Sequence, residues 1–118
     1  QAGRILRINA TTGATAVSAT LTTGTPILNR STGLAIDTAV NRAYVVDTDT
    51  NALYEVVVNG AQSGSRTEIS STTRGRGPSI PTFYALDASN GVVWVFDVDR
   101  YALMAIDPIS GDRVIASR

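Results

Sequence analysis

The stretch Gly33–Ser70 reads GLAIDTAVNRAYVVDTDTNALYEVVVNGAQSGSRTEIS, and the stretch Phe83–Ser117 reads FYALDASNGVVWVFDVDRYALMAIDPISGDRVIAS. The two stretches are copies of one repeat, because the same residues recur in them in the same order, fifty positions apart up to Leu53 and, after three extra residues in the first copy, forty-seven apart. The matched positions are Ala35, Asp37, Val45, Asp47, Asp49, Ala52 and Leu53, repeated as Ala85, Asp87, Val95, Asp97, Asp99, Ala102 and Leu103, and then Gly64 and Arg66, repeated as Gly111 and Arg113.

The opening segment Arg4–Ser18, RILRINATTGATAVS, matches only the second half of this repeat. Ile5 and Ile8 fall opposite Leu103 and Ile106 when the segment is aligned with the second copy. The chain therefore holds about two and a half repeats. We divide it into residues 1–29, half a repeat and its connector; residues 30–82, a complete repeat and its connector; and residues 83–118, a complete repeat, all in one domain.

Each repeat contains four short runs rich in β-branched and aromatic residues, separated by turn residues, which is typical of strands in all-β folds. A helical solenoid would need a 3.6-residue period, which Val-Val-Trp-Val-Phe lacks. Four antiparallel strands per repeat predict blades of a β-propeller in an incomplete ring. In the second copy the expected strands are Phe83–Leu86, Val92–Phe96, Leu103–Ile106 and Arg113–Ala116.

Alternating apolar residues in these runs predict the core. A blade buries its faces against its neighbours, so inward-pointing aliphatic residues should be shielded from water. Aromatic residues in the same strands are expected to fill the space between blades. The aliphatic residues expected in the core are Leu34, Ile36, Val45, Leu53, Val56, Leu86, Val95, Leu103 and Ile106, and the aromatic ones are Tyr44, Trp94 and Phe96.

The composition excludes several classes of function. The chain has no His, Cys or Lys, which removes the imidazole base, the thiol nucleophile and the Schiff-base amine. Its ten Arg residues are balanced by ten Asp and Glu, so no excess positive charge is present to bind nucleic acid. No apolar run is long enough for a membrane-spanning helix. These absences favour a binding module or scaffold over an enzyme.

The motifs Ala-Ile-Asp, Tyr-Val-Val-Asp, Leu-Tyr-Glu-Val and Gly-x-Arg resemble the blade pattern of the NHL and YWTD propellers and their relatives. The resemblance runs from Arg4 onwards and implies a parent propeller of six blades. Those families include receptor ectodomains, protein-interaction modules and calcium-dependent lactonases, so the fold alone does not choose among them. We therefore expect a non-catalytic scaffold for protein interaction and assembly, with a fragment of a calcium-dependent lactonase-type hydrolase as the alternative.

The resemblance also implies which residues share the face that propellers use for ligands. The loops after the second strand of each blade should lie beside the connector 71–82. Asp37, Asp47, Asp87 and Asp97 are expected to be structural residues of the repeat, with Asp47 and Asp97 accepting hydrogen bonds from neighbouring backbone amides. The competing hypothesis is that paired Asp-x-Asp loops bind calcium through Asp47, Asp49, Asp97 and Asp99. The expected ligand-face residues are Asp49, Arg74, Arg76, Asp99, Arg100 and Tyr101.

Asn9-Ala10-Thr11 and Asn29-Arg30-Ser31 match the glycosylation sequence Asn-x-Ser/Thr, which makes Asn9 and Asn29 candidate glycosylation sites. They indicate an extracellular or periplasmic setting. The unpaired ends of an incomplete ring call for partners. We expect these partners to be the remaining blades of a larger propeller or further copies of the chain, with homo-oligomers and filaments both open. Neither nucleic acid nor a cofactor is expected, apart from calcium if the Asp-x-Asp hypothesis holds.

Overall fold

The computed structural model describes residues 3–79 and 83–117, and the regular structure within them is entirely β. No helix occurs among these residues, hence none that could cross a membrane. The strands occupy the runs of β-branched and aromatic residues. They are β1 (Arg4–Ile8), β2 (Thr15–Thr20), β3 (Ser31–Asp37), β4 (Arg42–Asp47), β5 (Ala52–Val57), β6 (Arg66–Ser70), β7 (Phe83–Ser89), β8 (Val92–Asp97), β9 (Ala102–Ile106) and β10 (Arg113–Ser117).

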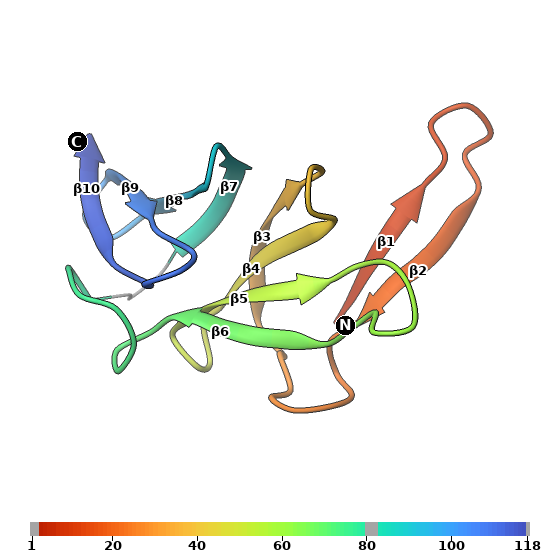
Figure 1. Cartoon of the computed structure of the whole chain (residues 1–118), viewed down its shortest axis with the longest axis horizontal. Helices are drawn as coiled ribbons and strands as arrows, with labels where there is room; N and C mark the ends of the chain where they lie inside the picture. Colours follow the sequence, from red (N-terminus) through yellow and green to blue (C-terminus); the bar gives the residue numbers. More distant parts are fainter. Residues whose placement is uncertain (1–2, 80–82, 118) are drawn as a thin grey trace.

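The strands form three antiparallel sheets that follow one another along the chain (Figure 1). β1 and β2 form a hairpin, β3 to β6 form the first four-stranded sheet, and β7 to β10 form the second. In each four-stranded sheet, every strand pairs with the next one along the chain. A single parallel pairing, between Gly33 and Ala85, joins β3 to β7. The first strands of the two larger sheets therefore lie next to each other.

The two four-stranded sheets share a β-bulge in their last strand pair. Arg66 pairs with Val56 in the first sheet, and Arg113 pairs with Ile106 in the second. The register then shifts before Ser70 pairs with Leu53 and before Ser117 pairs with Leu103. The repeat seen in the sequence is thus a structural repeat down to the position of this irregularity.

The first turns of the two sheets differ although their sequence spacing is the same. β7 and β8 are joined by the two residues Asn90 and Gly91, both at positive φ, which matches the right-handed twist of a hairpin. In the first sheet, Val40 stands at the position of Asn90, and a β-branched residue is poorly suited to positive φ. A four-residue turn forms instead between Asp37 and Arg42.

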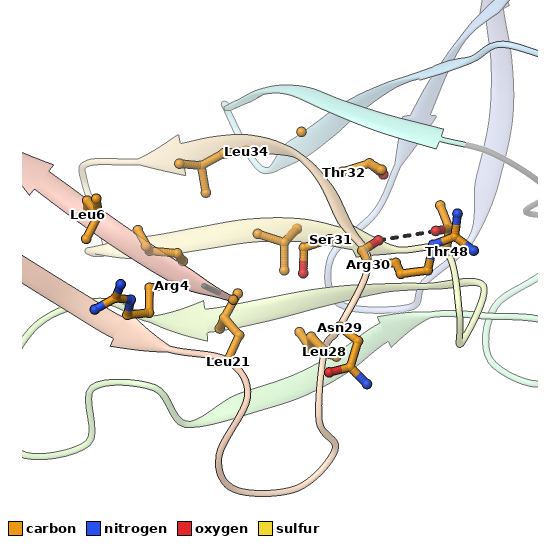
Figure 2. A pocket seen from close by; sticks show the side chains of 14 residues that line it. Arg4, Leu6, Leu21, Leu28, Asn29, Arg30, Ser31, Thr32, Leu34 and Thr48 are labelled. Atoms are coloured by element: carbon orange, nitrogen blue, oxygen red, sulfur yellow. Dashed lines mark hydrogen bonds between the residues drawn. The ribbon is translucent and has the colours of Figure 1, made fainter. Parts of the chain in front are cut away.

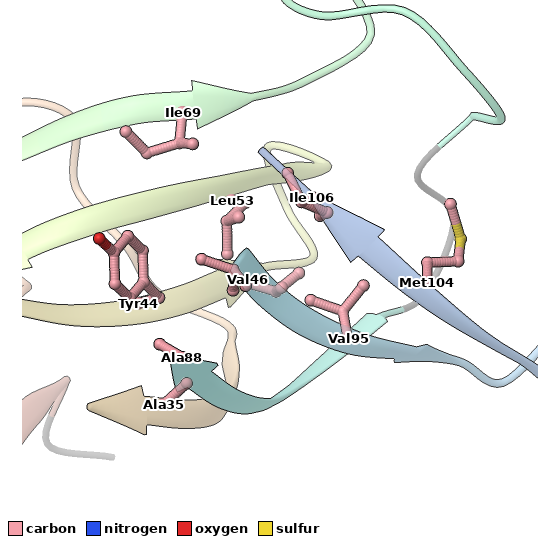
Figure 3. Packing of buried hydrophobic residues seen from close by; sticks show 10 residues of the cluster. Ala35, Tyr44, Val46, Leu53, Ile69, Ala88, Val95, Met104 and Ile106 are labelled. Carbon is pink, nitrogen blue, oxygen red and sulfur yellow. The ribbon is translucent and has the colours of Figure 1, made fainter. Parts of the chain in front are cut away.

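A core of apolar side chains joins the two four-stranded sheets (Figure 3). Leu53 and Ile106 have no exposed surface, and Val46 is 1% exposed. Because both sheets contribute side chains, the facing side of each sheet is buried only when the other sheet packs on it. The first sheet provides Ala35, Tyr44, Val46, Leu53 and Ile69, and the second provides Ala88, Val93, Val95, Met104 and Ile106.

A second core joins the hairpin to the opposite face of the first sheet. β4 is consequently buried on both faces, since Tyr44 and Val46 point into one core and Ala43 and Val45 into the other. The remaining members are Ile5, Ala19, Leu21, Leu28, Ala52, Tyr54 and Val56.

Tyr44 carries a polar group into the first of these cores. Its hydroxyl donates to Glu55 Oε2 at 3.3 Å, and Glu55 also accepts from Arg42 Nε at 3.2 Å. Burial and the neighbouring Glu55 carboxylate raise the pKa of Tyr44 to about 12. The phenol is therefore neutral and acts as a hydrogen-bond donor at the edge of an apolar contact.

The burial predicted from the sequence is confirmed for most of the named aliphatic residues and wrong for two. Val45, Leu53, Val56, Val95 and Ile106 are buried. Leu34 and Ile36 are instead 44% and 40% exposed. They alternate with Ala35, which points into the core between the sheets, so they face the other way, where no described part of the chain covers them. Leu103 is half-buried, and the Leu86 side chain lies outside the described residues.

Truncation of Leu53 to Ala should lower the free energy of unfolding by about 2–5 kcal/mol, because it leaves a cavity where two sheets meet. Urea denaturation measures this loss. Val40→Ala is the matched control, since Val40 is 52% exposed in the β3–β4 turn, and its effect should stay within about 0.5 kcal/mol. Equal losses in the two variants would contradict the assignment of the core.

Candidate functional site

Two buried carboxylates organise the loops that follow β4 and β8. Asp47 Oδ1 accepts the backbone N–H groups of Asp49 and Thr50, both at 3.1 Å. In the second sheet, Asp97 Oδ1 accepts the N–H groups of Asp99 and Arg100, both at 3.0 Å. Asp47 and Asp97 have no exposed surface. This is the bonding expected of an aspartate that caps a turn, because each carboxylate satisfies amides that the strand leaves unpaired.

The second oxygen of each carboxylate is linked to the segment that enters the same sheet. Asp47 Oδ2 accepts the N–H of Arg30 at 2.9 Å. Asp97 Oδ2 forms an ion pair with Arg100 at 2.6 Å, and Arg100 also donates to the Ser79 hydroxyl at 2.9 Å. Arg30 and Ser79 lie in the connectors that precede β3 and β7. The two loops therefore lie beside these connectors and hold them in place.

The geometry gives no support to the calcium hypothesis. Both oxygens of Asp47 and of Asp97 are engaged by donors of the chain. Asp49 is exposed and pairs with Arg30 at 3.6 Å, and Asp99 is exposed. Within residues 3–79 and 83–117, no three acidic side chains gather closely enough to hold a metal ion. A calcium ion would have to displace hydrogen bonds that already satisfy buried groups.

The other two repeat aspartates have different roles from each other. Asp37 Oδ1 accepts the N–H of Ala39 at 3.0 Å and so caps the four-residue turn. Asp87 lies two pairings before the end of β7, opposite Trp94, and its carboxylate accepts the Ser89 hydroxyl at 3.0 Å. The shorter Asn-Gly turn of the second sheet moves the end of β7 beyond Asp87, which explains the difference.

Arg74 and Arg76 do not meet the acidic loops with which the sequence analysis grouped them. Arg74 donates to the carbonyl of Ile109 at 3.4 Å, and Arg76 forms an ion pair with Asp112 at 2.9 Å. The Arg76 side chain holds the pKa of Asp112 below its ordinary value. The connector thus follows the β9–β10 turn before it reaches Ser79. The expected ligand face is divided between these two neighbourhoods.

Tyr101 is the most unusual member of the predicted ligand face. It is 79% exposed and has a φ of 51°, the same left-handed conformation as Asn51 at the equivalent position of the first sheet. Asparagine adopts this conformation readily, whereas a bulky tyrosine pays a steric cost. No contact among residues 3–79 and 83–117 explains the choice of tyrosine.

Two arginines that recur in the repeat, Arg66 and Arg113, make contacts that their pattern in the sequence did not predict; we call them the connector arginines. Each begins the last strand of its sheet and reaches back to the connector that leaves the preceding sheet. Arg66 donates to the carbonyl of Leu21 at 2.6 Å and also to that of Thr23. Burial lowers the pKa of its guanidinium group, and the carbonyl oxygens compensate by bonding the charged form.

Arg113 makes the same type of contact more extensively. Its Nη1 donates to the Ser70 hydroxyl at 2.6 Å and to the carbonyls of Ser71 and Arg74, both at 3.0 Å. Its Nε donates to the carbonyl of Pro78 at 2.7 Å. Arg113 is only 5% exposed, and burial lowers the pKa of its guanidinium. A planar fork of five donors suits this array of carbonyls.

The glycine two residues before each connector arginine permits the contact. Gly111 has a φ of 79°, and a Cβ there would lie 2.3 Å from the Ile69 carbonyl oxygen. Gly64 has a φ of 91°, which strains a residue with a side chain, although a Cβ there would lie at an ordinary 3.4 Å from the Thr20 carbonyl oxygen. Gly-x-Arg therefore links each sheet to the one before it. The sequence signal was its recurrence in both copies.

A groove of about 630 Å³ separates β1 from β3 (Figure 2). Its apolar lining includes the buried Leu21 and Leu28 and the exposed Leu6 and Leu34, with Arg4 at its side. Among the described strands, β1 pairs with β2 alone, so one backbone edge of β1 is open along this groove. An open edge beside apolar side chains is a surface suited to an added strand.

Comparison with the models of known protein families and with curated protein sequences finds no match for this chain. The resemblance to NHL and YWTD propellers therefore depends on the residues quoted above.

Replacement of Asp97 by Ala should lower the free energy of unfolding by about 1–3 kcal/mol, since the part-buried amides of Asp99 and Arg100 lose their acceptor. Thermal or urea denaturation with and without calcium measures the effect, and we expect calcium to leave the loss unchanged. Asp99→Ala is the control, because Asp99 is exposed. A calcium-dependent midpoint in the native chain that Asp97→Ala abolished would overturn the structural role of this carboxylate.

Replacement of Arg113 by Lys should cost about 1–3 kcal/mol, because an ammonium cannot satisfy carbonyls that lie on several sides of a planar guanidinium. Hydrogen exchange should then accelerate in the connector at Ser71 and Arg74. Arg7→Lys provides the control, since Arg7 is exposed in β1. Unchanged stability and exchange in Arg113→Lys would show that the contact contributes little.

Proposed function

We propose that the chain is a segment of a β-propeller that acts as a non-catalytic scaffold for protein interaction and assembly. In this proposal the four-stranded sheets are complete blades, with β3 and β7 as inner strands, and the hairpin is the outer half of a third blade. The adjacent parallel inner strands and the fan of sheets in Figure 1 support it. The parent ring has six blades in the families that the sequence resembles.

The observation that carries the proposal is the way in which one sheet meets the next. Both junctions combine an apolar core with a connector arginine that crosses between sheets. A chain built from such junctions has every blade covered by its neighbours except at its two ends. Those ends are therefore the surfaces through which it binds the remaining blades of a larger propeller, or further copies of itself.

The groove between β1 and β3 is where the inner half of the hairpin's blade belongs in this proposal. Leu6 and Leu34 are exposed apolar residues of this groove, Ile36 is exposed on the same side of β3 as Leu34, and β1 offers an unpaired edge. Two added strands would cover Leu34 and Ile36 and pair the edge of β1 at once. The exposure of Leu34 and Ile36 thus has a physical reason: their covering strands are supplied by another segment.

We also propose a location outside the cytoplasm, extracellular or periplasmic. Asn9 and Asn29 are both exposed, as a glycosylated asparagine must be. Asn9 has a structural task as well, because its Oδ1 accepts the N–H groups of Thr11 and Thr12 at 2.9 and 3.0 Å. Asp107 caps the equivalent turn of the second sheet. A glycan on the Asn9 amide nitrogen would leave this accepting oxygen in place.

Strand complementation tests the scaffold proposal. A synthetic peptide with the sequence 29–48, which contains the inner strands β3 and β4, is added to the full chain, and hydrogen exchange is followed by mass spectrometry. We expect slower exchange at the backbone amides of β1, because the peptide pairs with its open edge. A peptide of the same composition in scrambled order is the control.

The opposite result would be exchange at β1 that neither peptide changes, even when the peptide is in large excess. In that case the edge does not accept a strand, and the assignment of the hairpin as an outer half-blade is wrong.

A further inference from the structure

We infer that the outward faces at the two ends of the sheet stack bind each other between copies of this chain, head to tail. This inference rests on the proposed function and names its partner. The leading face is the outward side of the hairpin, formed by Leu6, Ile8 and Val17. The trailing face is the outward side of the second four-stranded sheet, formed by Tyr84, Trp94, Phe96 and Leu103.

The leading face has the positions that a sheet uses to contact its predecessor. Leu6 and Ile8 align with Met104 and Ile106, which the first four-stranded sheet covers completely. On the hairpin the same positions are 51% and 63% exposed. The strand pairing extends the match, because Val17 pairs with Leu6 as Ile115 pairs with Met104.

The trailing face has the positions that a sheet uses to contact its successor. Trp94, Phe96 and Leu103 lie fifty residues after Tyr44, Val46 and Leu53, which the second four-stranded sheet buries. In the last sheet these three are only half-buried, and Tyr84, paired with Phe96, is 42% exposed.

The equivalent residues Ile5, Leu53 and Leu103 show the same relation between a following sheet and burial in all three sheets. Ile5 and Leu53 are 7% and 0% exposed because the next sheet packs on each of them, whereas no sheet among the described residues packs on Leu103, the third member. Two of these positions are therefore covered by a following sheet, and the third is not covered by any sheet in residues 3–79 and 83–117. The leading face of a second copy has the residues equivalent to those that pack on Leu53 within the chain, so it can cover Leu103 in the same way.

The polarity of this contact follows from the internal junctions. In each of them, the side of one sheet that has the trailing-face positions packs on the side of the next sheet that has the leading-face positions. These two sides carry different residues. A contact between unlike faces leaves one free face on each end of a dimer, so association continues to a closed ring or an open chain of copies. Contact between like faces would stop at a dimer with twofold symmetry.

Two variants separate these possibilities. Ile8→Arg places a charge on the leading face, and Leu103→Arg places one on the trailing face. Sedimentation velocity of the native chain should show a mass that rises beyond the dimer with concentration. Each variant alone should remain a monomer, because every contact needs both faces. Val40→Arg, in a turn outside both faces, should behave as the native chain does.

Mixing the two variants gives the decisive result. Each retains the face that the other lacks, so the mixture should form a heterodimer of twice the monomer mass and nothing larger. Trp94 emission should shift to shorter wavelength at the same time. A native chain that stays monomeric, a dimer formed by Ile8→Arg alone, or a mixture that remains monomeric would each overturn the inference.

The folding of Leu103→Arg is checked by its near-ultraviolet circular dichroism. If that variant unfolds, Tyr84→Arg, at a more exposed position of the same face, replaces it. The outcome is independent of strand complementation at β1: association can fail while the edge still accepts the peptide, in which case the proposed scaffold stands and only the identity of its partner is wrong.

Discussion

The structure depends on one constraint, which is that its sheets are apolar on both faces. In β4, the run from Ala43 to Asp47 is buried without interruption, so the strand has no side on which water is tolerated. Such a sheet is stable only between two others. The stacking of three sheets, the two cores and the exposure of apolar residues at both ends all follow from this requirement.

Polar groups give the apolar stack a defined geometry. Asp47 and Asp97 act within a sheet, since they fix a loop and the incoming connector by short hydrogen bonds. Arg66 and Arg113 act between sheets, since they bind carbonyls of the connector that leaves the preceding one. Burial of apolar area is not directional. The arginines therefore supply the directional contact between neighbouring sheets that apolar burial does not.

Much of this arrangement could be predicted because it depends on the pattern of neighbouring residues in the sequence. The strand runs, the repeat length and the buried aliphatic residues of β4, β5, β8 and β9 follow from alternation and recurrence. The burial of Leu34 was predicted wrongly because alternation identifies two faces but not which of them a neighbour covers. The contacts of Arg113 could not be predicted because its partners are mainly backbone carbonyl oxygens. Every residue has one, so the sequence does not show which of them an arginine binds. The separate surroundings of Arg76 and Asp49 depend on the path of a connector.

The hairpin differs from the other sheets in one residue that bears on its role. The alignment that matches Gly13 with Gly111 places Thr15 where the other repeats have a connector arginine. A Cβ on Gly13 would meet nothing within 4 Å, whereas one on Gly111 would strike the neighbouring sheet. The leading face thus lacks the polar contact that fixes the internal junctions and offers apolar side chains alone. A junction made there has less to define its orientation and less to hold it, so it should form and dissociate while the internal junctions stay closed.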